Sequence, residues 1–317
     1  MTDKLYPMMM TPTLHVKVWG GRKLETKLGK TLFGDSPYGE SWELHDTCTI
    51  GNGAYAGQEL SDVIAKRGAD ILGKGFDPNE GLPLLVKLLD ANEWLSVQVH
   101  PNDEQAKALE GEPRGKTEAW IVLAADPAAQ LVIGITPGTD QEALADAIRE
   151  DTIESMLEYA MVEKDDVLYM PANTVHAIGP GLLIYEVQQS SNTTYRLYDW
   201  GRTGLDGKPR DLHIEKGVQV SNLEKLPDVT RPEGEVLVDG DYFQTKRLIL
   251  DSDTKALDTE GVFHSLTCID GVMTIQHTNG SIDLTMGQTA LVPAGLGAYD
   301  LMGTGTVLLS HMVRTGE

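Results

Sequence analysis

The sequence is poor in cysteine, in basic residues and in long apolar runs. Its two cysteines, Cys48 and Cys268, lie far apart in 317 residues, which excludes a disulfide framework and fits a reducing compartment. Lys and Arg number 26 against 48 Asp and Glu, for a net charge of −22. Such a field repels phosphate, so nucleic acid and anionic membrane are excluded as general partners, and an anionic substrate binds only where a few cations converge.

No apolar run reaches the length of about 18 residues that a membrane-spanning helix needs. The N-terminal stretch MTDKLYPMMMTPTL also lacks the apolar core of a signal peptide. We therefore expect a cytoplasmic protein that does not contact membranes.

Short β-rich runs separated by turn signals dominate the chain from about Glu93 onward. They occupy residues 94–100, 118–124, 129–135, 166–171 and 182–188, and the tail from 231 to 317 is again β-rich. Closely spaced short strands are typical of a sandwich or barrel and not of a parallel α/β sheet.

Helical periodicity interrupts this pattern in two places. Residues 57–73 have it between glycines, and Thr139 with Glu142 resembles a capping box ahead of ALADAIRE. We expect two short helices, the second within about 139–160, as an insertion or an added layer.

Two segments resemble each other. Residues 165–178 and 287–301 each contain a turn, an apolar strand and then Pro-Ala. Five residues after the proline the first segment has His176, whereas the second has Ala298. This pattern predicts a catalytic domain over 1–230, with an N-terminal extension, and a related C-terminal domain over 231–317 without a metal site.

A metal-ligand set can be assembled from three of the short strands. Gln98 and His100 are two residues apart, so both side chains point to one face of a strand. Glu118 opens the next run and His176 ends a third. Two histidines, a carboxylate and an amide oxygen suit a catalytic zinc, and they would equally suit Fe(II).

Cations interrupt strongly apolar runs in this acidic chain. Lys87 and Glu186 each lie inside such a run, Arg196 follows ten residues after Glu186, and Arg202 closes the same segment. One interpretation is an internal salt bridge, for instance of Lys87 or Arg196 with Glu186. We favour the other, a site for an anionic, oxyanion-rich ligand, because Arg and Lys are the usual phosphate binders.

Two further side chains belong with this cluster. Lys116 lies two residues before Glu118, so both can share a strand face. Trp19 stands beside a Gly-Gly pair that allows a ligand to approach closely.

Several motifs together resemble type I mannose-6-phosphate isomerase, in its shorter bacterial branch. They are WGGRKL (19–24), GESWEL (39–44), SVQVHPND (96–103), GKTEAW (115–120), MPANTVHAIG (170–179) and QQSSNTTYRLYDWGR (188–202). The match runs in order from about residue 10 to the C-terminus. It implies a mainly β fold, a double cupin of two jelly-roll-like β-barrels with a small helical insertion.

The resemblance also implies residue roles. One zinc ion per chain would be held by His100, Glu118 and His176, and by Gln98 in many members. Arg196 would be the catalytic arginine, with Lys116 and Glu186 lining the pocket. Ser96, Lys87 and Arg202 match positions near the substrate phosphate, although longer members carry a lysine where Arg202 stands.

The implied reaction interconverts mannose 6-phosphate and fructose 6-phosphate through a cis-enediolate. The general acid–base would be Glu186 or Lys116. The alternatives are a related isomerase of unphosphorylated aldoses or of a different sugar phosphate, an Fe(II)-dependent cupin dioxygenase and a non-catalytic sugar-binding cupin. We expect a monomer or a homodimer, with a small sugar phosphate as its partner.

Overall fold

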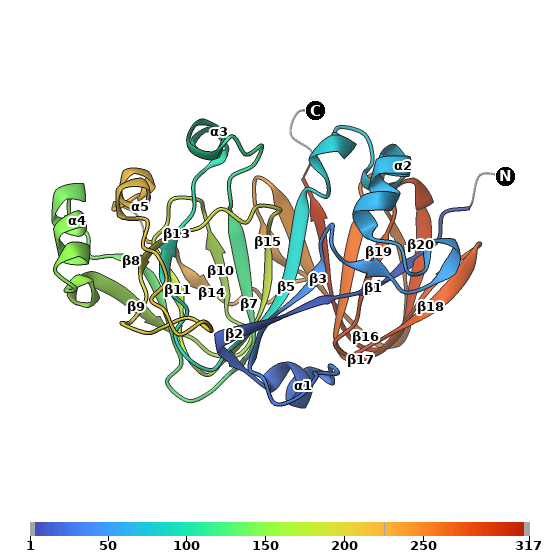
Figure 1. The fold of residues 1–317 in the computed structure, drawn as a ribbon. Helices are drawn as coiled ribbons and strands as arrows, with labels where there is room; N and C mark the ends of the chain where they lie inside the picture. The colour runs from blue at the N-terminus through green and yellow to red at the C-terminus, as the bar shows by residue number, and fades with distance from the viewer. Residues whose placement is uncertain (1–3, 225, 314–317) are drawn as a thin grey trace.

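The chain is built mainly of antiparallel strands, as predicted. The computed structural model describes residues 4–224 and 226–313. Two β-sheet units lie side by side, and short helices lie at their outer edges and ends (Figure 1).

The first unit contains a seven-stranded sheet and two smaller sheets. The large sheet runs in the order β14 (Val229–Thr230), β10 (Val167–Met170), β7 (Glu118–Ala125), β12 (Leu182–Gln189), β5 (Leu84–Ala91), β3 (Tyr38–Leu44) and β2 (Thr13–Gly21). The smaller sheets are β11 (Ala177–Ile178), β8 (Gln130–Ile135) and β9 (Leu157–Met161), and β13 (Tyr195–Tyr198) with β6 (Val97–Val99). The predicted strands in this region are thus confirmed, with that of 94–100 shortened to β6.

The second unit is a single eight-stranded sheet that draws on both ends of the chain. Its order is β15 (Val236–Asp239), β16 (Phe243–Asp258), β20 (Ala298–Met312), β17 (His264–His277), β19 (Thr289–Val292), β1 (Met8–Thr11) and β4 (Thr49–Ile50), with β18 (Gly280–Thr285) paired to β17. The predicted division of the chain at residue 230 stays a prediction.

Besides the strands, the described residues form five short helices. They are α1 (Lys23–Leu28), α2 (Leu60–Leu72), α3 (Asp103–Glu110), α4 (Gln141–Arg149) and α5 (Ile214–Val220), with single 3₁₀ turns at Gly53–Tyr55, Pro78–Glu80, Ile153–Met156 and Ala294–Leu296. The helix expected within 57–73 is α2.

The second predicted helix is shorter than expected and is capped differently. Asp140, not Thr139, accepts the hydrogen bond from Ala143 N at 2.8 Å, and the Thr139 hydroxyl donates to Thr136 O. The helix ends at Arg149, and Asp151 follows with a φ of 59°. The extension to residue 160 is wrong because 157–161 form strand β9, which pairs with β8.

The central strand β12 is buried on both faces. Tyr185 points toward the second unit, where its hydroxyl lies 2.8 Å from Ser310 Oγ. Ile184 and Glu186, on the opposite face, point into the first unit, where Ile184 joins an apolar cluster with Trp120. Burial on both faces explains why this segment reads as a nearly continuous apolar run.

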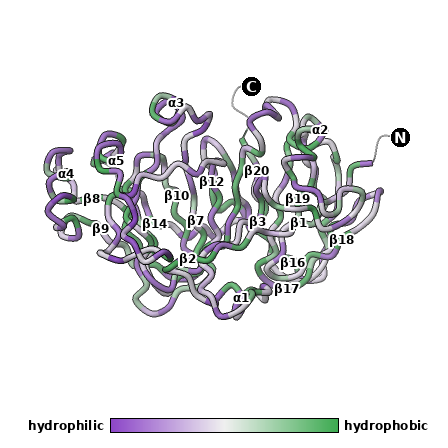
Figure 2. Tube along the Cα trace, in the orientation of Figure 1, coloured by the Kyte–Doolittle hydropathy of each residue, from purple (hydrophilic) through white to green (hydrophobic). Residues whose placement is uncertain are grey.

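Hydropathy follows the same arrangement. Figure 2 shows hydrophobic residues along the central strands and hydrophilic residues along much of α4. Within the described residues, no helix combines the length and the apolar character needed to cross a bilayer.

Candidate functional site

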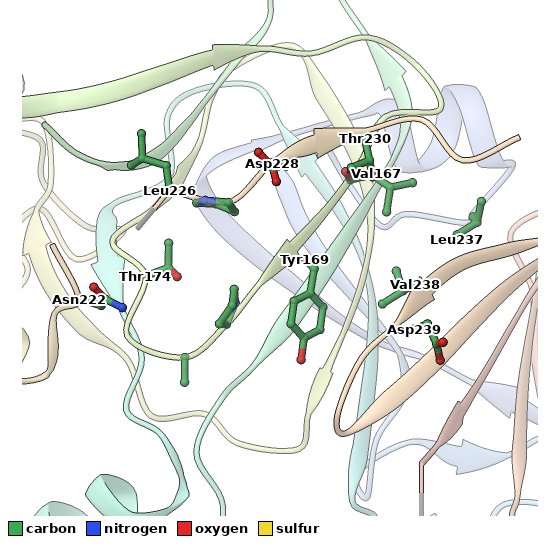
Figure 3. A pocket seen from close by; sticks show the side chains of 13 residues that line it. Val167, Tyr169, Thr174, Asn222, Leu226, Asp228, Thr230, Leu237, Val238 and Asp239 are labelled. Carbon is green, nitrogen blue, oxygen red and sulfur yellow. Dashed lines mark hydrogen bonds between the residues drawn. The ribbon is translucent and has the colours of Figure 1, made fainter. Parts of the chain in front are cut away.

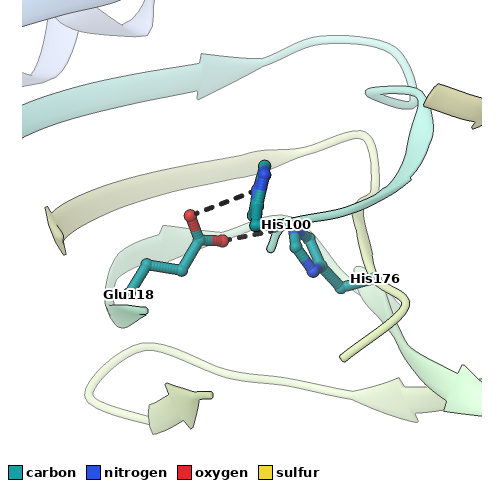
Figure 4. A group of neighbouring side chains, drawn as sticks. All are labelled: His100, Glu118 and His176. Atoms are coloured by element: carbon teal, nitrogen blue, oxygen red, sulfur yellow. Dashed lines mark ion pairs between the residues drawn. The ribbon is translucent and has the colours of Figure 1, made fainter. Parts of the chain in front are cut away.

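His100, Glu118 and His176 come together in the interior of the first unit (Figure 4). His100 directly follows β6, Glu118 opens β7, and His176 lies just before β11. Glu118 Oε1 lies 3.2 Å from His176 Nε2, and Oε2 lies 3.6 Å from His100 Nε2. At most 2% of each of the three side chains is exposed.

Both imidazoles are held with one nitrogen turned toward this group. The Nδ1 atoms of His100 and His176 lie 2.9 Å from the carbonyl oxygens of Thr193 and Thr174. A carbonyl only accepts, so each Nδ1 carries the hydrogen and each Nε2 keeps its lone pair. Burial lowers the pKa of both rings, and Lys116 acts in the same direction, so both stay neutral near pH 7.

The carboxylate of Glu118 is short of hydrogen bonds. Among the described residues no donor of good geometry reaches either oxygen, although Lys116 Nζ lies 2.7 Å from Oε2 as an ion pair. A buried carboxylate is costly without such partners. Two neutral imidazole nitrogens and a carboxylate with open lone pairs fit a divalent metal ion.

Gln98 lies beside this group. Its backbone forms an antiparallel bridge with His176, and its Nε2 atom lies 3.3 Å from His176 Nε2. Its Oε1 atom accepts a hydrogen bond from Ser96 Oγ at 3.4 Å. The role of Gln98 as a fourth ligand stays a prediction.

A cavity of about 310 Å³ adjoins the group through Gln98 and Lys116. Of the predicted site residues, it is lined by Trp19, Lys87, Ser96, Gln98, Lys116, Glu186 and Arg196. Further wall residues that the sequence did not single out are Lys17, Glu40, Asn192, Thr194 and Arg210. Sequence motifs scattered from residue 17 to residue 210 thus converge on one polar cavity.

The cavity contains the internal salt bridge between Lys87 and Glu186, which was one of the two interpretations of the sequence. Lys87 and Glu186 are direct cross-strand neighbours on β5 and β12, with Nζ 2.8 Å from Oε1. Trp120 Nε1 donates to the other oxygen at 3.0 Å. Burial opposes ionisation of Glu186, but Lys87 and Lys116 outweigh it and lower its pKa, so the group is a carboxylate.

Arg202, which the family resemblance places near the substrate phosphate, is not among the residues that line the cavity. Its Nε and Nη2 atoms donate to Asp199 Oδ1 at 3.1 and 2.9 Å, and Nη1 donates to Trp94 O. All its nitrogens are therefore engaged by the protein. Asp199 and Trp94 hold the Arg202 side chain, and its predicted place near the substrate phosphate stays a prediction.

A larger cavity, of about 540 Å³, lies beside β10, β14 and β15 (Figure 3). Tyr169, Asp228 and Asp239 are among the side chains that line it, and no described residue in its wall is basic or a histidine. The chemistry therefore points to the smaller cavity.

Comparison with known proteins agrees with this geometry. The family model for the catalytic domain of type I phosphomannose isomerase matches residues 8–128, and the model for the cupin domain of mannose-6-phosphate isomerase matches 234–312. A probable mannose-6-phosphate isomerase of Bacillus subtilis is 32% identical over 96% of this chain and 99% of its own length. The chain belongs to the type I phosphomannose isomerase family.

Other relatives support the same membership. A mannose-6-phosphate isomerase of Streptococcus mutans is 34% identical over 80% of this chain and 82% of its own length. The crystal structure of the mannose 6-phosphate isomerase from Bacillus subtilis superposes with a TM-score of 0.87 at 28% identity, covering 96% of this chain and 99% of that one. The predicted family, the double cupin fold and the assignment as an isomerase are confirmed.

The wall residues that the sequence analysis missed differ in the sequence signal that could have revealed them. Lys17 stands two residues before Trp19 on β2, so strand alternation could have placed both at one wall. Arg210 comes from the irregular stretch between β13 and α5, where no periodicity relates it to the strands.

Proposed function

We propose that this chain interconverts mannose 6-phosphate and fructose 6-phosphate with one zinc ion bound by His100, Glu118 and His176. The observation that carries the proposal is the buried group of two neutral histidines and an under-bonded carboxylate, opening through Lys116 and Gln98 onto a charged cavity. The names of the relatives supply the substrate. Zinc in this site would supply Lewis acidity toward the substrate oxygens.

Side chains at the cavity wall can carry out the proton transfers of the reaction. The reaction takes a proton from C2 of the aldose and returns one to C1, through a cis-enediolate. Glu186, ionised and at the wall, can accept the proton, and Lys116 Nζ, 2.7 Å from Glu118, can donate one beside the metal group. Both remain candidates for the general acid–base.

Arg196 is suited to stabilise the negative charge that develops on the enediolate. Its Nη1 donates to Asp211 O at 2.9 Å, whereas its buried Nε has no hydrogen-bond partner among the described residues. A guanidinium N–H that is fixed at the cavity wall and still available is the preorganised donor such a charge requires.

Isomerisation in D₂O tests the reaction and its intermediate together. Purified protein should convert mannose 6-phosphate to fructose 6-phosphate carrying deuterium at C1, detected by NMR, because an enediolate exchanges its proton with solvent. Fructose 6-phosphate without any deuterium would indicate that the C2 hydrogen reaches C1 without exchange, either by a hydride shift or on a base shielded from water. Absence of the product, with metal bound, would refute the proposed function.

The cytoplasmic location, the absence of nucleic-acid and membrane partners, and the monomeric or homodimeric state stay predictions.

A further inference from the structure

The lysines of the cavity are each balanced by a carboxylate. Lys17 Nζ lies 3.0 Å from Glu40 Oε1, and the Lys87–Glu186 and Lys116–Glu118 pairs are shorter, at 2.8 and 2.7 Å. Paired in this way, Lys17 and Lys87 contribute little net charge toward an anionic ligand, and Lys116 is held beside the metal group. A substrate phosphate, which is dianionic near neutral pH, needs positive charge from elsewhere in the wall.

That positive charge lies on a cluster of arginines around Asp199. Arg202 and Arg210 both bond the Asp199 carboxylate, whose side chain is only 7% exposed. Arg196 lines the same cavity as Arg210, and burial together with the neighbouring Arg210 and Arg202 lowers the pKa of Arg196. The other acidic neighbours, Asp211 and Glu93, are exposed, so water screens their charge.

Arg210, unlike Arg202, keeps part of its guanidinium group available for a ligand. Arg210 donates from Nε to Asp199 Oδ2 at 2.7 Å and from Nη2 to Oδ1 at 2.5 Å, and its Nη1 is in no such bond with any described residue. It lines the cavity with 26% of its side chain exposed. Arg202 has every nitrogen engaged and does not line the cavity.

The segment that carries Arg210 is itself ordered by local bonds. Thr203 and Pro209 form an antiparallel bridge, and Gly204 N donates to Lys208 O at 2.7 Å. Asp199 therefore fixes one edge of the Arg210 guanidinium while the segment fixes its backbone. The unused edge suits a phosphate oxygen, since a guanidinium forms directed, charge-assisted hydrogen bonds.

We propose that Arg210 binds the phosphate group of the substrate and determines the preference for a phosphorylated over a free sugar, with Asp199 as its positioning residue. This inference rests on the proposed function. It moves the phosphate contact from Arg202, and from the neutralised Lys87, to a residue outside the motifs that carry the family resemblance.

Steady-state kinetics of Arg210→Gln test the inference. The KM for mannose 6-phosphate should rise about 10- to 100-fold, as expected for the loss of a charged hydrogen bond. The value of kcat and the activity on free mannose should change little. Arg210→Lys should give an intermediate KM. Lys208→Met removes an exposed charge from the same segment and should leave KM unchanged.

An unchanged KM in Arg210→Gln would overturn the inference, and so would an equal loss on free mannose, which would indicate a general disturbance of the site. Calorimetric titration with inorganic phosphate separates this failure from failure of the proposed function. If the wild-type protein does not convert mannose 6-phosphate, phosphate binding that weakens in Arg210→Gln still supports the anion site. Binding that is absent, or equal in both proteins, overturns it.

Discussion

At the scale of single residues, the site depends on which polar atoms the protein leaves without partners. Glu118 and Arg196 Nε are buried yet under-bonded among the described residues, while most of their neighbours are fully engaged. Buried polar groups are usually satisfied, so such exceptions indicate a ligand. In these two residues the open atoms are those that would face a metal ion and a developing negative charge.

Replacement of Arg196 tests the second of these assignments. Arg196→Ala should lower kcat for mannose 6-phosphate by about 100- to 1000-fold, the usual effect of removing one preorganised donor. Zinc content should stay at the wild-type level, because Arg196 is not one of the proposed zinc ligands. Arg149→Ala, at an exposed pair on α4, is the matched control and should not affect kcat. Full turnover in Arg196→Ala would contradict the assignment.

At the scale of elements, local chemistry decided where α4 begins, and a neighbouring strand decided where the helical segment ends. Thr139 and Asp140 are adjacent, and both are good capping residues. The Thr139 hydroxyl is used by the preceding turn, so Asp140 caps the helix. Pairing of 157–161 with β8 then overrides any helical tendency there.

The two capping candidates can be compared directly. Asp140→Ala should lower the free energy of unfolding by about 1 kcal/mol, because the amide of Ala143 loses its acceptor. Thr139→Ala, the matched control, should cost less, since its hydroxyl caps no helix. Urea denaturation of both variants provides the measurement. A larger loss in Thr139→Ala would show that the cap is assigned to the wrong residue.

The same contrast explains how much of the site the sequence could predict. Gln98, His100, Glu118 and His176 could be grouped because each stands in or beside a short apolar run and strand alternation fixes its face. Arg210 could not, because it reaches the cavity through an irregular segment held by Asp199. Long-range pairing of that kind leaves no local pattern.

At the scale of the whole molecule, the two β-units are joined by more than chain order. Strands β1 and β4 come from the N-terminal end and complete the sheet of the second unit, which the sequence did not predict. Lys30 forms a buried ion pair with Glu43 at 2.7 Å, and Glu43 also accepts from Thr289 Oγ1 on β19. The second unit therefore covers one face of the seven-stranded sheet of the first unit, which keeps β5 and β12 buried on both faces.

The measurement that tests the central claim most directly is turnover of mannose 6-phosphate before chelation, after chelation and after zinc is added back. The metal group of His100, Glu118 and His176 is buried, and within the described residues both Glu118 oxygens lack a hydrogen-bond partner. We therefore predict that activity disappears with the metal and returns at about one zinc per chain. Full activity in metal-free protein would contradict the account.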